Sequence, residues 1–282
     1  MRDEALSWTI PVMRAGYAGR GLTYLVIAGF SLWAISQGGQ AQGPSSALAS
    51  LETTTGGGVM LVLIFLGLLA YAAWRVIAAA LDLDAHGSEA KGLVARVAMV
   101  ITGLIHLSLG IAALTLLTSS GGSEGESRLR EWVGTVMGWP GGRWIVGLGG
   151  LAIIAAGAKY VAEGWTASFE RYLAASSFTS RWRTALRVGV AAHGVAIAVI
   201  GLLFLTAAWQ ADPSEAGGLA GAFDWLRGKP YGRALVAALC LGLLGFALFC
   251  FVNARWRIVP RVAGDKTETL ARAVQRMAAG AL

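Results

Sequence analysis

Residues 187–208 read RVGVAAHGVAIAVIGLLFLTAA, and two other segments align with them without a gap. Residues 96–117 read RVAMVITGLIHLSLGIAALTLL, and residues 14–35 read RAGYAGRGLTYLVIAGFSLWAI. Each segment opens with an arginine and continues as an apolar run that is about long enough to cross ~30 Å of hydrocarbon as a helix. The chain therefore contains a repeat, and each copy begins with a predicted membrane span.

A second apolar run follows each of these segments, at 59–81, 144–165 and 234–254. Arg75, Lys159 and Cys250 share one alignment column in these runs, and they lie 61, 63 and 63 residues after the leading arginines. Because each repeat then crosses the membrane twice, all three copies insert in the same orientation. The predicted fold is all-α, with six transmembrane helices arranged as three parallel tandem hairpins around a pseudo-threefold axis.

The composition identifies a bilayer as the solvent. Of the 282 residues, 56% are hydrophobic and only 14% are charged, so the chain is too apolar to cover itself with a polar surface in water. Membrane strands alternate apolar and polar residues, whereas these runs are continuously apolar. Helices are the form that remains, since a helix satisfies its own backbone hydrogen bonds in lipid.

The distribution of charge predicts the orientation. Of the 23 Lys and Arg residues, 17 lie within 1–20, 75–96, 159–187 and 255–282, that is, around the amino-terminal segment, two of the loops and the carboxy-terminal tail. The positive-inside rule places these regions, and hence both termini, in the cytoplasm. The net charge of +7 then lies beside anionic lipid headgroups, and we expect no nucleic-acid partner. A cleaved signal peptide is the competing interpretation of the first run, but cleavage would destroy the first repeat.

The repeats divide the chain into seven predicted parts. Repeats one, two and three span 14–84, 96–170 and 187–257. A cytoplasmic segment, two cytoplasmic loops and a basic cytoplasmic tail make up the rest, at 1–13, 85–95, 171–186 and 258–282.

Small residues and turns recur between the repeats. Two small positions seven residues apart share one helical face, so each first helix is predicted to offer a groove to a neighbouring helix. A short amphipathic segment at the outer surface is predicted before each second helix, followed by a turn. The turn is Pro-Gly-Gly-Arg at 140–143 and Pro-Tyr-Gly-Arg at 230–233, whereas repeat one has only Thr-Gly-Gly-Gly at 55–58. The groove positions include Gly103, Gly110, Gly194 and Gly201.

This organisation resembles the bacterial domain-of-unknown-function 1206 family. The resemblance rests on the threefold unit, its leading arginine, the outer Pro-x-Gly-Arg turn and a second helix that ends in residues such as Tyr71, Trp74 and Arg75. It covers the chain from about 14 to 257, and repeat one departs from it at the outer turn. The resemblance implies a protein of the bacterial cytoplasmic (inner) membrane, and it transfers no catalytic residue.

Two histidines inside predicted spans are candidates for cofactor binding, because ionisable groups in a membrane are functional candidates. His193 shares an alignment column with Arg20 and Thr102, and His106 shares one with Tyr24 and Ile197. A bis-histidine haem needs two rings on one iron, and nothing in the spacing shows this convergence. We expect helix-packing hydrogen bonds and no cofactor.

Other polar groups have simpler expected roles. Lys159 and Glu163 are spaced i, i+4 and can form an intramembrane polar pair, although residues near the interface commonly extend to the headgroups. The loop with Asp82, Asp84, His86 and Glu89 offers possible ligands for a divalent cation, but ordinary loop polarity is favoured and no metal is expected. Possible contacts with lipid or a partner are Arg14, Arg96, Arg187, Arg143 and Arg233.

Three functions are compatible with these features. The sequence carries no phosphate-binding Gly-x-x-x-x-Gly-Lys and no His-Glu-x-x-His. A Gly-x-Ser-x-Gly stands at 121–125, but no predicted strand precedes it, as a nucleophile elbow requires, and we expect no enzyme. The favoured hypothesis is a non-catalytic scaffold or accessory subunit that binds membrane-protein partners or lipid. The alternatives are a channel or transporter for a small solute or ion, with Arg20, Lys159 and Glu163 along its path, and a haem-binding electron carrier.

Overall fold

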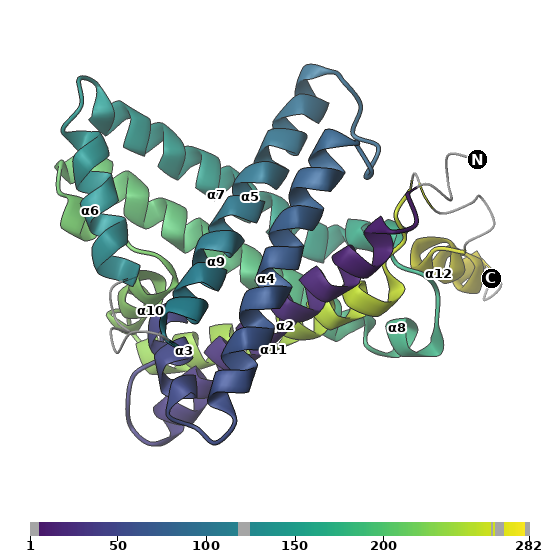
Figure 1. Ribbon diagram of the computed structural model, residues 1–282, viewed down its shortest axis with the longest axis horizontal. Helices are drawn as coiled ribbons and strands as arrows, with labels where there is room; N and C mark the ends of the chain where they lie inside the picture. Colours follow the sequence, from purple (N-terminus) through teal and green to yellow (C-terminus); the bar gives the residue numbers. More distant parts are fainter. Residues whose placement is uncertain (1–5, 118–124, 261, 263–267, 280–282) are drawn as a thin grey trace.

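The computed structural model describes residues 6–117, 125–260, 262 and 268–279, and this part of the chain contains six long apolar helices (Figure 1). Each has 24 to 28 residues, so it is about 36–42 Å long and sufficient to cross a bilayer. The six predicted spans are therefore confirmed. Their bounds are α2 (Thr9–Ser36), α4 (Gly57–Ala80), α5 (Ala90–Thr115), α7 (Gly142–Thr166), α9 (Arg183–Gln210) and α11 (Gly232–Trp256).

Several helices begin earlier than the apolar runs indicate. α5 begins at Ala90 and α9 at Arg183, inside the predicted loops 85–95 and 171–186. The reason is that hydropathy marks only the part of a helix that suits hydrocarbon, while polar residues continue the same hydrogen-bonded ladder beyond it. The predicted segments 1–13 and 258–282 lie partly outside the described residues.

The short helices lie at the two ends of the bundle. The beginning of α2 lies at one end, here called the terminal end, together with η1 (Ser168–Tyr172), α8 (Ser177–Arg181) and α12 (Leu270–Ala279) (Figure 1). At the opposite end, here called the far end, one short helix precedes the second long helix of each repeat. The far end also contains η2 (Pro213–Glu215), which follows α9 in the chain. These helices are α3 (Pro44–Glu52), α6 (Gly125–Met137) and α10 (Leu219–Arg227).

The long helices pack mainly in pairs that cross the repeat boundaries. α4 packs on α5, α7 on α9, and α11 on α2, so the first helix of each repeat contacts the second helix of the preceding one. Within repeats one and three the two helices also pack together, whereas α5 and α7 share no comparable interface. The three hairpins thus form a ring that is open at repeat two, and the α4–α5 and α7–α9 pairs point in clearly different directions in Figure 1.

Glycines bring the paired helices into backbone contact, as the small-residue pattern predicts. A Cβ added at Gly194 would lie 2.7 Å from the carbonyl oxygen of Gly157, and one at Gly201 would lie 2.8 Å from that of Gly150. Gly103 and Gly110 face α4 in the corresponding way. Such contacts replace the hydrophobic driving force that is missing between helices in lipid.

The same small-residue rule explains why the ring is open. In repeat one, Gly19 faces Gly67, and a Cβ on either would lie 2.4 Å from the other Cα. In repeat three the matching columns hold Ala192 and Gly242, which also contact each other. In repeat two these columns hold the larger residues Ile101 and Leu151, and both are 52% exposed. In repeats one and three, small residues at these columns let the two helices of the hairpin pack together. In repeat two, larger side chains occupy the same columns.

The turns before the second helices have one backbone conformation in all three repeats. Gly56, Gly141 and Tyr231 have φ values of 80°, 76° and 60°, and each is followed by a glycine that begins the helix. A Cβ at Gly142 would lie 1.7 Å from the carbonyl oxygen of Val136, so glycine is required there. Repeat one thus lacks the proline and arginine of the motif but keeps its turn.

Candidate functional site

The most unusual side chain in the bundle is Arg20 of α2, which is only 3% exposed. Its Nη1 donates to the hydroxyl oxygen of Tyr71, at 3.0 Å, and its Nη2 donates to Nε2 of His193, at 3.2 Å. Because a guanidinium is only a donor, Nε2 of His193 must accept, and this imidazole is therefore neutral with its proton on Nδ1. Arg20 consequently joins α2, α4 and α9 by hydrogen bonds.

Aromatic rings enclose this arginine. The guanidinium carbon lies 4.8 Å from the ring centre of Phe246, 5.1 Å from that of Tyr71 and 5.7 Å from that of Tyr24. The ring of His193 stacks on Phe246 with centres 3.8 Å apart, and Tyr160 of α7 packs edge-on against it. Such ring faces attract a cation.

His106 adds the last of the six long helices to this polar centre. It is 8% exposed, its ring lies 4.8 Å from that of Tyr71, and its Nδ1 donates to the carbonyl of Thr102 at 2.8 Å. His193, by contrast, already uses Nε2 for Arg20, so an iron at that nitrogen would have to displace the arginine. We call the group of Arg20, Tyr24, Tyr71, His106, Tyr160, His193 and Phe246 the polar centre.

A second buried cation lies toward the terminal end, and it has a carboxylate partner. Nη2 of Arg257 donates to both oxygens of Asp84, at 3.0 and 3.1 Å. Burial alone would raise the pKa of the Asp84 carboxyl, but the charges of Arg257 and Arg75, with hydrogen bonds from Arg257, hold that pKa below its usual value. This pair joins the end of repeat one to the end of repeat three.

The arginines predicted to contact lipid or partners have a different geometry. Nε of Arg96 donates to the carbonyl of Ala79 at 2.6 Å, and Nε of Arg187 donates to that of Gly164 at 3.1 Å. The last carbonyls of a helix have no partner within it, and a cation is favourable there. Arg143 and Arg233 bond the last turns of α9 and α2 in the same way, through the carbonyls of Ala208, Trp209 and Ile35.

Arg14 is the exception among the five. It shares the column of Arg96 and Arg187 but is exposed, and no hydrogen bond or ion pair is found for it within the described residues. Contact of these arginines with lipid stays a prediction, since in four of them the guanidinium is already engaged with a helix end.

The remaining polar candidates lie away from the polar centre. Lys159 and Glu163 form an ion pair of 3.6 Å, but the Lys159 side chain is 70% exposed, so it does not share an interior path with Arg20. In the candidate metal loop, Asp82 accepts from the backbone amides of His86 and Gly87, at 2.7 and 3.0 Å, and Asp84 is paired with Arg257. No group of three or more potential metal ligands occurs among the described residues.

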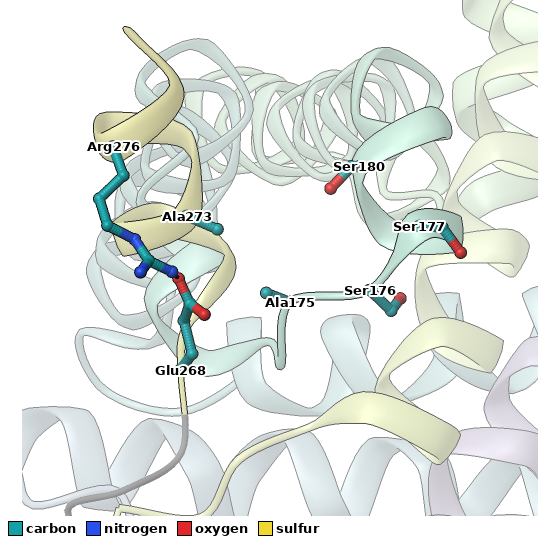
Figure 2. Close-up of a pocket in the computed structure, with 7 residues that line it drawn as sticks. All are labelled: Ala175, Ser176, Ser177, Ser180, Glu268, Ala273 and Arg276. Carbon is teal, nitrogen blue, oxygen red and sulfur yellow. Dashed lines mark ion pairs between the residues drawn. The ribbon is translucent and has the colours of Figure 1, made fainter. Parts of the chain in front are cut away.

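A hollow at the terminal end lies between α8 and α12 (Figure 2). Three serines occupy its α8 side, while Glu268 and Arg276 occupy the α12 side and form an ion pair with each other. Because that charge is already compensated, the hollow offers less binding chemistry than the polar centre. Its lining residues are Ala175, Ser176, Ser177, Ser180, Glu268, Ala273 and Arg276.

The fold and the polar centre define a polytopic α-helical membrane protein built from three tandem hairpins. The chain belongs to the family described as Domain of Unknown Function (DUF1206), whose model matches residues 15–82, 97–167 and 188–257. It is similar to the "Uncharacterized protein YxxB" of Bacillus subtilis (strain 168), with 25% identity over 257 residues, which cover 90% of this chain and 93% of that relative. No solved structure matches the chain.

The sequence contained a signal for the polar centre that residue-by-residue reasoning did not use. Arg20 and His193 occupy the same column of repeats one and three, and positions related by a pseudo-threefold axis can meet on that axis. The structure brings these two side chains into contact. Tyr71 and Phe246 also share a column, and both lie against Arg20.

Proposed function

We propose that the chain is a non-catalytic scaffold or accessory subunit of the bacterial cytoplasmic membrane, with both termini in the cytoplasm. Its role would be to hold a transmembrane segment of another membrane protein between α5 and α7. The observation that supports this proposal is the opening of the ring at repeat two, where the other repeats pack helix against helix.

The burial of the two helices agrees with an exposed packing surface. In the most apolar 18-residue stretches of α5 and α7, only 22% and 17% of the stretch is buried. The corresponding share in the other four long helices is 39% to 50%. Ile101 and Leu151 lie in the columns that form the closed hairpins of repeats one and three, so they mark the surface that is left open. In lipid, shape complementarity and close packing drive helix association, and a partner with small residues could pack against these larger ones.

Photo-crosslinking in cells tests the proposal. A photoreactive phenylalanine analogue is placed at Ile101 or Leu151, and at Leu241 of α11 as the control, because Leu241 is similarly exposed at 60%. We expect a discrete protein adduct from positions 101 and 151 that position 241 does not give. Lipid adducts alone, equal at all three positions, would show that the opening holds lipid and no partner helix.

Transport of a small solute is the second candidate, and one observation favours it. The polar centre receives side chains from all six long helices, as a binding site on the path of a transporter does. Reconstituted vesicles that pass protons, common ions or small metabolites only when the protein is present would support this function. Absence of any such flux would remove it.

A further inference from the structure

The polar centre holds a positive charge that lacks a counter-charge within the described part of the chain. The guanidinium of Arg20 is buried, and both of its hydrogen bonds go to neutral acceptors, the Tyr71 hydroxyl and the His193 imidazole. No salt bridge joins it to a carboxylate among the described residues. An uncompensated cation inside a membrane protein is costly, and residues of this kind commonly mark a ligand site.

The donors of Arg20 are also not all used. A guanidinium has five N–H groups, and the two bonds above engage two of them. Its Nε is buried and has no hydrogen-bond partner among the described residues. The Tyr71 hydroxyl uses its oxygen to accept from Arg20, so its own proton is available to a further acceptor.

A second cation, Arg75, lies near the ring of the same tyrosine. The guanidinium carbon of Arg75 is 6.0 Å from the ring centre of Tyr71, and that of Arg20 is 5.1 Å from it. Nε of Arg75 is likewise buried without a partner in the described chain. Asp84, whose carboxylate feels the charge of Arg75, is already bonded to Arg257.

We propose that Arg20, Tyr71 and Arg75 form a binding site for an oxyanion, namely a phosphate group. Two guanidinium groups and a hydroxyl supply the planar, charge-assisted donors that such groups accept from. The oxyanion belongs either to a free solute or to the headgroup of an anionic lipid, and the chemistry at Arg20 is the same for both. The site does not depend on what occupies the opening between α5 and α7.

Native mass spectrometry of the full chain in detergent, combined with thermal unfolding, tests this site. Phosphatidylglycerol and inorganic phosphate are titrated in separate arms, which distinguish a lipid from a free solute. We expect at least one probe to bind and to raise the unfolding temperature, and Arg20→Gln to weaken that binding by about tenfold or more. Lys159→Gln, which removes an exposed cation of the membrane region, should stay within about twofold of the unmodified chain.

A second variant keeps the test decisive if Arg20→Gln does not fold. Tyr71→Phe retains the ring and removes only the hydroxyl, so we expect a folded protein that binds the same probe about three- to tenfold more weakly. Binding of neither probe to the unmodified chain would overturn the proposal. Unchanged affinity in every folded variant of Arg20 and Tyr71 would also overturn it.

Discussion

At the scale of single residues, two buried arginines show two ways to accommodate a charge. Arg257 has a carboxylate partner in Asp84, both of whose oxygens accept from Nη2, and both side chains are at most 10% exposed. Arg20 has neutral acceptors and three aromatic faces instead. The first arrangement compensates the buried charge with a carboxylate, whereas the second leaves a donor of Arg20 unused at the polar centre.

We expect Asp84→Asn to destabilise the protein by about 3–5 kcal/mol, because it leaves the Arg257 cation buried without its partner. Asp224→Asn is the matched control. It breaks the Asp224–Arg227 pair, whose side chains are 62% and 44% exposed, and should cost about 1 kcal/mol or less. The measurement is denaturant unfolding in detergent, and equal losses in the two variants would contradict the structural role of the buried pair.

The same pair predicts a dependence on pH. Since the pKa of Asp84 is lowered in the folded state, its contribution is fully present above the carboxyl's unfolded pKa and is lost as pH falls through the folded pKa. Unfolding measured from neutral to acid pH should show a stability difference between the unmodified chain and Asp84→Asn that shrinks below about pH 4. A difference that persists undiminished in acid would mean that the ionised carboxylate is not its cause.

At the scale of helices, close backbone approach at glycine determines which helices pair. A Cβ at Gly157 would lie 2.6 Å from the backbone nitrogen of Ala198, so Gly157→Ala forces α7 and α9 apart. We expect a loss of about 1–3 kcal/mol from this overpacking. Gly149→Ala on the same helix has nothing within 4 Å of the added methyl and should be neutral or stabilising. Thermal unfolding of the two variants checks this, and an equal loss in both would indicate a general effect of alanine on α7.

Arginine side chains also cap the helix ends in these helix pairs, by hydrogen bonds to the last carbonyl groups. Arg187→Gln removes donors to the carbonyls of Gly164 and Trp165, so we expect a loss of about 1–3 kcal/mol. Arg14→Gln, in the equivalent column of repeat one, removes an exposed arginine without such a bond and should change the stability little. The rate of amide hydrogen exchange at the end of α7 is a local measurement of the same effect, and it should increase only in Arg187→Gln. No increase there would contradict the capping role.

Sequence reasoning predicted the elements better than the polar centre, and the reason is physical. Hydropathy and the near-constant offset of 61, 63 and 63 residues from each leading arginine to the second-helix column depend on the chain alone, so the six spans and the three hairpins followed from them. Which repeat stays open depends on residues from two helices at once, such as Ile101 and Leu151. The contact of Arg20 with His193 likewise joins residues 173 positions apart, and it required the tertiary arrangement.

At the scale of the whole molecule, the three repeats are similar in backbone but different in use. Each repeat supplies two spans and a far-end turn that is followed by a glycine at the start of the second helix. Within the described part of the chain, arginines cap both ends of a helix pair only at α7–α9. Repeats one and three supply most of the polar centre, and repeat two supplies the opening. The proposed oxyanion site and the proposed docking surface therefore lie in different repeats of one ring.

Three hairpins that cross the membrane in one orientation place all far-end turns on one side and all terminal-end loops on the other, and cysteine labelling in intact cells measures this. Single cysteines are introduced at exposed positions of the far end, Thr55, Trp139 and Lys229, and of the terminal end, Glu89 and Ser177, after Cys240 and Cys250 are replaced by alanine. A membrane-impermeant maleimide should label all three far-end sites and, before lysis, neither terminal-end site. Labelling of one far-end turn but not another, or of far-end and terminal-end sites together, would contradict three hairpins in one orientation. Labelling of Glu89 and Ser177 with no far-end site labelled would instead reverse the predicted orientation.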